Sequence, residues 1–235
     1  MTKQGTLYGV GVGPGAPDLL TLRAARLIKA APVVAYPTLA GGESFARAIA
    51  AEFIAPDTTE IVMDVPMTPA REPAQAAYDV GAKDIAVHLV AGRDVVCLCE
   101  GDPFFYGSFM YLFARFSEDF AVEIVPGVTS MTACAGAAGM PLVARNECLS
   151  VVPGPLPEEA LRAQITAADA VVVMKVGRHL QKIKTVIADL GLMGQAVYVA
   201  RASLVDQVQC PLEDAPEQAP YFSMILIAKG ADPWL

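Results

Sequence analysis

Charged residues are scarce in this chain of 235 residues: they make up 18% of it, whereas hydrophobic residues make up 54%. Basic residues are fewer than acidic ones: the chain has 17 lysines and arginines and 25 acidic residues, which gives a net charge of −8. This balance argues against nucleic acid as a partner, because affinity for a phosphate backbone depends on basic patches. A small anionic substrate held by a few arginines stays possible. The apolar composition predicts extensive burial, a sizeable subunit interface, or both.

Long hydrophobic runs are also missing, since no uninterrupted run approaches the ~20 residues that span a bilayer. Residues 1–5 lead directly into a strand pattern and do not have the layout of a secretory signal. We therefore expect a cytoplasmic protein without a membrane contact.

Metal-binding and nucleophile motifs are absent as well. The five cysteines form no CxxC pair, and with only two histidines beside them we expect no metal site. The sequence contains no HExxH and no GxxxxGK[ST] phosphate loop, and no Ser-His-Asp or Cys-His set is evident. We expect Cys97 and Cys99, which alternate on one predicted strand, to be small buried hydrophobic residues.

The most informative stretch of the chain is residues 95–109. It starts with the short apolar run 95–99, which suits a buried parallel strand. The run stops at Gly101-Asp102-Pro103, where glycine permits unusual backbone angles and proline cannot continue a sheet ladder. Open α/β sheets bind their ligands at such carboxyl ends of strands.

The apolar segment after this turn, residues 104–116, predicts a well-buried helix. The rings of Phe104, Phe105 and Tyr106 lie beside Asp102, which we expect to be a fixed acceptor. A flat heterocyclic ligand that carries hydroxyls or a cation would suit these groups.

A glycine-rich loop follows the first apolar strand. The spacing of Gly11, Gly13 and Ala16 resembles a dinucleotide-binding fingerprint. Pro14 and Pro17 interrupt the transition to a helix, and the next strand ends without the acidic residue that would hold a ribose. A tight turn that only closes the strand against the helix is the alternative.

A second strand, 122–125, ends at a Pro-Gly turn, and Thr129 or Ser130 would cap a helix of small residues over 133–139. The N–H groups and hydroxyls at this helix start suit a ligand with carboxylate and ribose oxygens. Ordinary helix capping is the alternative.

The order of elements predicts an α/β protein of two domains, 1–126 and 127–235. Strands and helices alternate early, which favours a mostly parallel N-terminal sheet. Strands crowd together late, which favours a mixed C-terminal sheet. The helices expected are 43–53, 74–91, 158–167 and 179–190, and the later strands are 149–152, 170–175, 196–201 and 223–228.

Four motifs resemble those of the tetrapyrrole methyltransferases, which use S-adenosylmethionine (SAM). They are VGVGPGAPDLLT from Val10, EGDPFFYGSFMY from Glu100, PGVTS from Pro126 and the element Arg201-Ala202-Ser203. The extended EGDPFFYGSFMY and the segment YPTLAGGES from Tyr36 resemble the precorrin-2 C(20)-methyltransferase branch of cobalamin synthesis. The resemblance covers nearly the whole chain.

The resemblance implies a two-domain homodimer with the tetrapyrrole-methylase fold. Its N-terminal domain would line a tetrapyrrole trough, and its C-terminal domain would complete the SAM pocket. By the same resemblance, the SAM-binding residues are Gly101, Asp102, Phe105, Tyr106, Thr129, Ser130, Met174, Ala202 and Met224. The substrate-binding candidates are Gly13, Pro14, Arg71 and Arg201. For Arg71 a solvated surface arginine, and for Arg201 an internal acid partner, are the alternatives.

The reaction implied is methylation of precorrin-2 at meso carbon 20 to give precorrin-3A, with S-adenosylhomocysteine as the second product. A sulfonium methyl group is already activated, so the absence of an evident enzyme nucleophile fits this chemistry. The cobalt-precorrin-2 enzyme of the anaerobic branch, methylation of another ring carbon, a dinucleotide-dependent oxidoreductase and a tetrapyrrole carrier are the alternatives. No proton acceptor is assigned; Glu100, Asp102, Tyr106 and His179 are the nearest candidates.

Overall fold

The computed structural model describes residues 3–39, 42–66 and 70–230. The chain divides into two compact units, Met1–Thr129 and Ser130–Leu235. Parts of two expected loops, residues 40–41 of YPTLAGGES and residues 67–69 before Arg71, lie outside the described residues.

The first unit is built on a five-stranded parallel sheet with the order β3-β2-β4-β1-β5. This confirms the parallel N-terminal sheet. Because all five strands run the same way, their carboxyl ends share one edge. The strands are β1 (Thr6–Gly11), β2 (Val33–Leu39), β3 (Thr59–Val65), β4 (Val95–Cys99) and β5 (Ala121–Val125). The helices are α1 (Leu22–Ala30), α2 (Phe45–Ala50), α3 (Glu72–Val90) and α4 (Phe109–Phe116), with 3-10 turns at Pro17–Leu19 and Ala51–Phe53.

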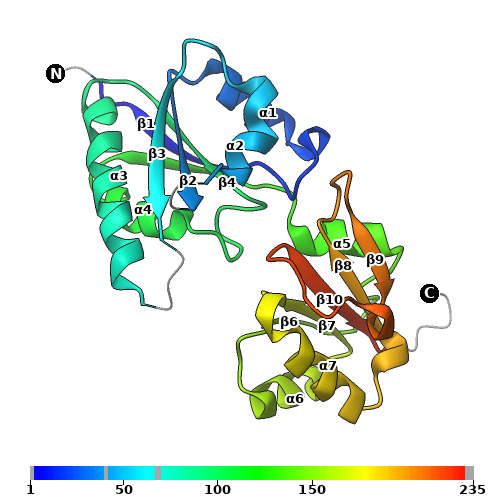
Figure 1. Ribbon diagram of the computed structural model, residues 1–235. Helices are drawn as coiled ribbons and strands as arrows, with labels where there is room; N and C mark the ends of the chain where they lie inside the picture. The colour runs from blue at the N-terminus through cyan, green and yellow to red at the C-terminus, as the bar shows by residue number, and fades with distance from the viewer. Residues whose placement is uncertain (1–2, 40–41, 67–69, 231–235) are drawn as a thin grey trace. The chain divides into compact units, whose positions relative to one another are not determined.

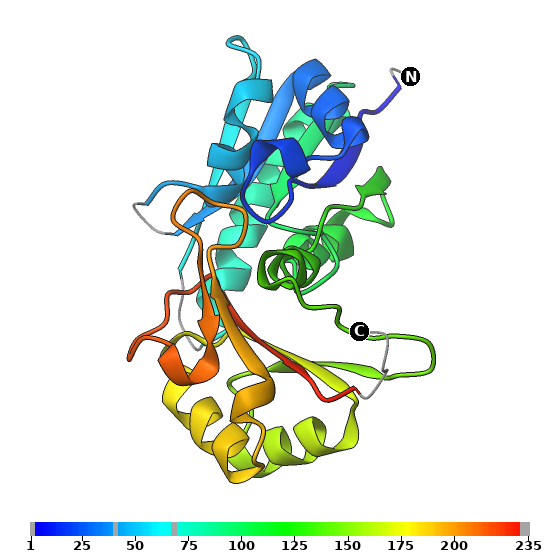
Figure 2. The same ribbon diagram turned by 90° about the vertical axis from the view of Figure 1, so that its right-hand side faces the viewer.

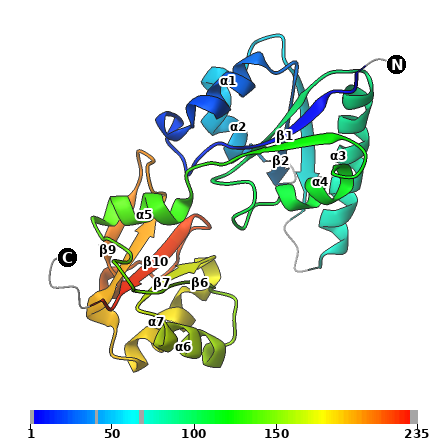
Figure 3. The ribbon, with the colours of Figure 1, turned by 180° about the vertical axis from the view of Figure 1, so that it is seen from behind.

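Helices cover both faces of this sheet, with α1 and α2 on one face and α3 and α4 on the other (Figures 1 and 3). The central strand β4 shows why: Val96 and Leu98 pack toward α1 and α2, whereas Cys97 and Cys99 pack toward α3 and α4. Every residue of β4 is buried, as expected for a strand covered on both sides. The two cysteines are buried members of the apolar core, as the alternation predicts.

The second unit is built on a mixed five-stranded sheet with the order β6-β7-β10-β8-β9. Only β6 and β7 pair in parallel, and the other pairs are antiparallel, which confirms the mixed C-terminal sheet. The strands are β6 (Leu149–Pro153), β7 (Ala170–Met174), β8 (Ala196–Ala200), β9 (Val208–Pro211) and β10 (Ser223–Ala228). The helices are α5 (Ser130–Ala138), α6 (Glu158–Ala167) and α7 (Leu180–Asp189), with 3-10 turns at Gly177–His179, Met193–Gln195 and Leu212–Asp214.

Helices α6 and α7 lie side by side on one face of this sheet (Figure 2), and α5 packs on the other. The small residues of α5 let it lie close to the strands, and Cys134 on this helix is buried. No helix among residues 3–39, 42–66 and 70–230 has the length and apolar character that a membrane crossing requires.

The helix expected over residues 104–116 is wrong in its first part, because α4 begins at Phe109. The residues before it form a loop, and the Phe104 side chain is 46% exposed. Asp102 accepts main-chain hydrogen bonds that hold a turn at Phe104 and Phe105, and Tyr106 has a left-handed φ of 56°. Both features are incompatible with a helix that continues from the turn.

Candidate ligand site

The carboxyl ends of β1 and β4 are joined by an antiparallel bridge between Gly13 and Gly101. The Gly101 amide donates to the Gly13 carbonyl at 2.8 Å, and the Gly13 amide donates to the Gly101 carbonyl at 3.3 Å. Both glycines have positive φ, 81° at Gly13 and 63° at Gly101, which few side chains tolerate. The bridge brings together two loops that are almost ninety residues apart in the sequence and that the sequence separately marked as ligand loops.

A third loop, after β5, packs into the same place. A Cβ atom added at Gly127 would lie 2.0 Å from the Gly101 carbonyl oxygen, and one added at Gly11 would lie 2.7 Å from the Gly127 Cα. Real side chains do not make such approaches, so the backbones of the three loops touch only because Gly11 and Gly127 lack side chains. Sequence reasoning missed both roles, since the sequence alone does not show which strands are neighbours.

Asp102 connects two of these loops through its half-buried carboxylate. Its Oδ1 accepts hydrogen bonds from the amides of Phe104 at 2.9 Å and Phe105 at 3.2 Å. Its Oδ2 accepts one from the Gly127 amide at 3.1 Å. The side chain expected to be an acceptor for a ligand therefore has three main-chain donors of its own.

The loop after Asp102 presents aromatic rings at this edge of the sheet. Tyr106 is 43% exposed, and its ring packs edge-on against that of the half-buried Phe105 at 5.3 Å between centroids. A left-handed backbone at a bulky residue such as Tyr106 costs free energy, and such residues cluster at ligand sites. This loop therefore carries both rings of the predicted contact with a flat heterocycle.

Titratable groups beside the turn stay in their uncharged forms more readily than usual. Burial raises the pKa of Tyr78 to about 12. Protein atoms packed around the carboxyl of Glu100 raise its pKa, although part of the residue reaches solvent. The contact with Cys97, together with burial, raises the pKa of the Cys99 thiol well above its usual range. These shifts fit the apolar packing around the buried end of β4.

Within the second unit, the predicted residues Met174, Ala202 and Met224 belong to one apolar cluster that α5 covers. Ala202 and Met224 are buried, and Met174 is half-buried at the end of β7. Ser130 is the first residue of α5, and the half-buried Thr129 precedes it. The loops after β7 and β8 carry left-handed residues at Lys175, Arg201 and Ser203.

The substrate-binding candidates separate into two groups. Gly13 is buried in the bridge to Gly101, and Pro14 follows it half-buried. Arg71 is exposed just before α3. Arg201 forms an ion pair with Asp206 of its own loop, which favours the alternative that this arginine has an internal acid partner.

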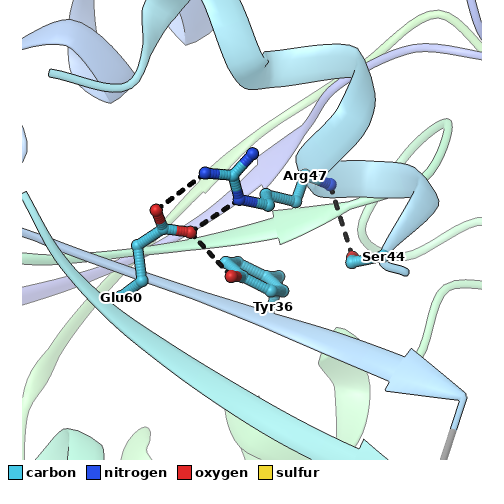
Figure 4. A network of polar contacts seen from close by, with 4 residues as sticks. All are labelled: Tyr36, Ser44, Arg47 and Glu60. Atoms are coloured by element: carbon cyan, nitrogen blue, oxygen red, sulfur yellow. Dashed lines mark hydrogen bonds and ion pairs between the residues drawn. The ribbon is translucent and has the colours of Figure 1, made fainter. Parts of the chain in front are cut away.

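A polar network away from these loops was not expected from the sequence. The bidentate ion pair of Arg47 with Glu60 has distances of 2.8 and 2.9 Å, and the Tyr36 hydroxyl donates to Glu60 at 2.6 Å (Figure 4). The contact with Arg47 lowers the pKa of Glu60, and burial together with Glu60 raises that of Tyr36. The network joins α2 to β2 and β3, so it positions elements and does not line the loops of the site.

Among the described residues, no group of three histidine, cysteine, aspartate or glutamate side chains is arranged to hold a metal ion. In the part of the chain that is described, His179 lies half-buried in the 3-10 turn before α7, where burial lowers its pKa. The loops of the first unit offer glycine backbone, aromatic rings and the Thr129 hydroxyl, and the predicted residues of the second unit offer the Ser130 hydroxyl and two methionines.

Comparison with known proteins agrees with this fold. The family model "Tetrapyrrole (Corrin/Porphyrin) Methylases" matches residues 6–216. A precorrin-2 C(20)-methyltransferase of Sinorhizobium sp is 41% identical over 97% of this chain and 97% of its own length. A cobalt-precorrin-2 C(20)-methyltransferase of Salmonella typhimurium is 32% identical over 96% of this chain and 97% of its own length.

One solved structure extends the comparison to a bound ligand. The uroporphyrin-III C-methyl transferase of Thermus thermophilus, complexed with S-adenosyl homocysteine, is 28% identical and superposes with a TM-score of 0.70. The superposition covers 94% of this chain and 97% of that one.

A parallel sheet whose glycine loops meet at its carboxyl edge is typical of α/β proteins that bind a small ligand at that edge. The match over residues 6–216, together with the 41% identical relative, narrows this broad class of α/β proteins to one family. The chain belongs to the tetrapyrrole methylases, a family of SAM-dependent methyltransferases.

Proposed function

We propose that the protein transfers the methyl group of SAM to meso carbon 20 of precorrin-2 and forms precorrin-3A in cobalamin synthesis. The observation that carries the proposal is the Gly13–Gly101 bridge, which joins the two most specific family motifs at the carboxyl edge of the sheet. The 41% identity to a precorrin-2 C(20)-methyltransferase supports carbon 20. The lower identity, 32%, to the cobalt-precorrin-2 enzyme favours the metal-free substrate.

Bound SAM would supply an activated methyl group, with the electron pair of the broken sulfur–methyl bond left on sulfur. The electron-rich ring provides the pair for the new carbon–carbon bond, and carbon 20 loses its proton to a base, for which the side chains named above are the candidates. Apart from this proton transfer, the chain's own residues need only bind, orient and exclude water. Orientation alone lowers barriers by about 7–11 kcal/mol in favourable cases. A site without a protein nucleophile is sufficient for this.

The residues present fit the cofactor. We assign its contacts to Gly101, Phe105, Tyr106, Thr129, Ser130, Met174, Ala202 and Met224. Asp102, which the resemblance places among them, accepts three main-chain hydrogen bonds and contributes through the loops that it holds. Buried methionines and a small alanine suit an adenosine, and glycine backbone with exposed aromatic rings suits the rest of a sulfonium nucleotide. Gly13, Pro14 and Arg71 are the proposed substrate contacts. Arg201 is a weaker candidate for such a contact, because its side chain already forms an ion pair with Asp206.

A cytoplasmic homodimer stays a prediction from the sequence and the family. Light scattering coupled to size-exclusion chromatography measures the subunit number directly. A monomer at micromolar concentration would contradict the dimer.

The experiment that tests the reaction uses SAM with a ¹³C-labelled methyl group and enzymatically prepared precorrin-2. We expect a product heavier by one methyl group whose labelled carbon gives an NMR signal of a methyl on a meso position. A labelled methyl on a pyrrole carbon would overturn the assignment to carbon 20. Turnover of the cobalt complex with none of the metal-free ring would instead assign the other branch.

Calorimetric titration separates the proposal from the dinucleotide-binding alternative. We expect S-adenosylhomocysteine to bind, and NAD and NADP not to bind. Binding of a tetrapyrrole without any SAM-dependent product would point to a carrier.

A further inference from the structure

The carboxylate of Asp102 lies between two loops at the carboxyl edge of the first sheet. The Asp102 loop follows β4 and the Gly127 loop follows β5. These two strands are the neighbours of β1 in the sheet. The two residues are 25 positions apart in the sequence, so their hydrogen bond is a tertiary contact. Each loop contains residues that the family resemblance assigns to SAM: Tyr106 in one and Thr129 in the other.

The three hydrogen bonds of this carboxylate come from backbone amides. The hydrogen bonds from Phe104 and Phe105 shape the turn that carries Tyr106, and the bond from Gly127 fixes the start of the segment that carries Thr129. The glycine contacts leave the loops no room to approach more closely, since a Cβ at Gly127 would lie 2.0 Å from the Gly101 carbonyl. Steric contact thus limits the approach, and Asp102 holds the loops at that limit.

We infer that Asp102 is a positioning residue that couples the β4–α4 loop to the Gly127 loop and so sets the relative placement of the SAM-contacting residues on both. Its effect on the cofactor passes through the backbone that it holds. The part of the inference that concerns SAM rests on the proposed function, whereas the coupling of the two loops is a property of the ligand-free protein.

The variants Asp102→Asn and Asp102→Ala test this. An amide has one acceptor oxygen, so asparagine can satisfy either the Phe104 and Phe105 amides or the Gly127 amide, and its NH₂ group faces the other donors. Alanine satisfies neither set. The asparagine variant keeps the test valid if the alanine variant does not fold.

The matched control is Asp94→Asn. Asp94 also accepts a main-chain hydrogen bond, from Thr6 at 2.7 Å, but it lies at the opposite end of β4. Asparagine keeps an acceptor oxygen for this bond, and any change at this end of β4 should leave both loops unchanged.

The first measurement is amide hydrogen exchange by NMR in the ligand-free full-length protein. We expect the Gly127 amide, or the Phe104 and Phe105 amides, to exchange at least tenfold faster in Asp102→Asn, and all three to do so in Asp102→Ala. Unchanged exchange at all three positions in both variants would overturn the inference, whatever the cofactor does.

The second measurement is affinity for S-adenosylhomocysteine and the steady-state kinetics. We expect the dissociation constant and the KM for SAM to rise about tenfold in Asp102→Asn, with kcat at saturating SAM nearly unchanged, because bound cofactor restores the loop arrangement. Circular dichroism at the assay temperature checks that the variant is fully folded, because a protein that is partly unfolded at equilibrium would also show a raised KM. Weaker binding with normal exchange at all three amides would make Asp102 a direct ligand and overturn its positioning role.

Failure of the proposed function gives a different result. If the wild-type protein did not bind S-adenosylhomocysteine, the proposed function would fail, while the exchange experiment would still decide whether Asp102 couples the loops.

Discussion

Gly127 determines how closely the loops after β4 and β5 can approach. We expect Gly127→Ala to destabilise the first unit by about 1–3 kcal/mol, because the new Cβ would lie 2.0 Å from the Gly101 carbonyl oxygen and the backbone has to move. Denaturant unfolding followed by circular dichroism measures the loss, and calorimetry should show weaker binding of S-adenosylhomocysteine.

A matched glycine provides the control. Gly136 lies on α5, and an added Cβ there meets no atom within 4 Å. Gly136→Ala should stabilise the protein slightly, by up to about 1 kcal/mol, because alanine is the better helix former. Equal destabilisation by both substitutions would show that the close contact at Gly127 is unimportant.

The cysteines should differ sharply in reactivity. Burial raises the pKa of Cys134 to about 12, and the contact with Cys97, together with burial, raises that of Cys99 well above its usual range, so neither forms the nucleophilic thiolate at neutral pH. Cys148 is exposed. With iodoacetamide at pH 7.5, peptide mass spectrometry should find Cys148 alkylated at least tenfold faster than either buried cysteine.

Unfolding in urea should remove this difference. Fast alkylation of Cys99 in the native protein would mean that the core around β4 opens more readily than its complete burial suggests.

The motif residues could be predicted from the sequence, but their partners could not. Glycine, aspartate and proline after an apolar run identify the turn at Gly101 from local chemistry alone. The contact of Asp102 with Gly127 depends on which strands flank β1, and nothing local encodes that order. Gly11 and Gly127 resemble ordinary loop glycines until the strands are placed side by side.

The ion pair of Arg47 with Glu60 attaches α2 to the edge of the first sheet. Because the contact with Arg47 lowers the pKa of Glu60, the pair stabilises the folded state above the ordinary carboxyl pKa of about 4.3, and this contribution is lost as the pH falls through the lower folded value. The Arg47 side chain is 42% exposed, so solvent screening limits the contribution to about 1 kcal/mol.

We therefore expect Glu60→Gln to lower the free energy of unfolding by about 1 kcal/mol or less at pH 7 and by progressively less toward pH 3. Urea titrations at several pH values measure this difference. The exposed residue Glu52 serves as the control, and Glu52→Gln should show little effect at either pH. A difference for Glu60→Gln that grows as the pH falls would contradict the assigned sign.

Periodicity located most elements, and its failures have physical causes. The apolar segment before Phe109 looked helical, but the hydrogen bonds of Asp102 and the left-handed Tyr106 hold it as a loop. Strand β9 was not predicted, because only Cys210 of its residues is even partly buried. An exposed edge strand carries little hydrophobic pattern.

At the scale of the whole molecule, the sequence predicted one parallel and one mixed sheet, and both are confirmed. The alternation of strands and helices in the first half dictates parallel pairing, since each crossover helix returns the chain to the same edge. The crowding of strands in the second half allows antiparallel pairing. Each unit has apolar clusters of its own on both faces of its sheet.

Because each unit has its own apolar core, we expect a cavity made in one unit to destabilise mainly that unit. Ile85 on α3 and Ile183 on α7 are both 0% exposed, in the first and the second unit respectively. Replacing a buried isoleucine with alanine costs about 2–5 kcal/mol. Hydrogen exchange with mass spectrometry should therefore show lost protection mainly within residues 1–129 for Ile85→Ala and within 130–235 for Ile183→Ala. Equal loss across both units in either variant would mean that the chain unfolds as a single cooperative unit, because a cavity then lowers the stability of every buried amide by the same amount.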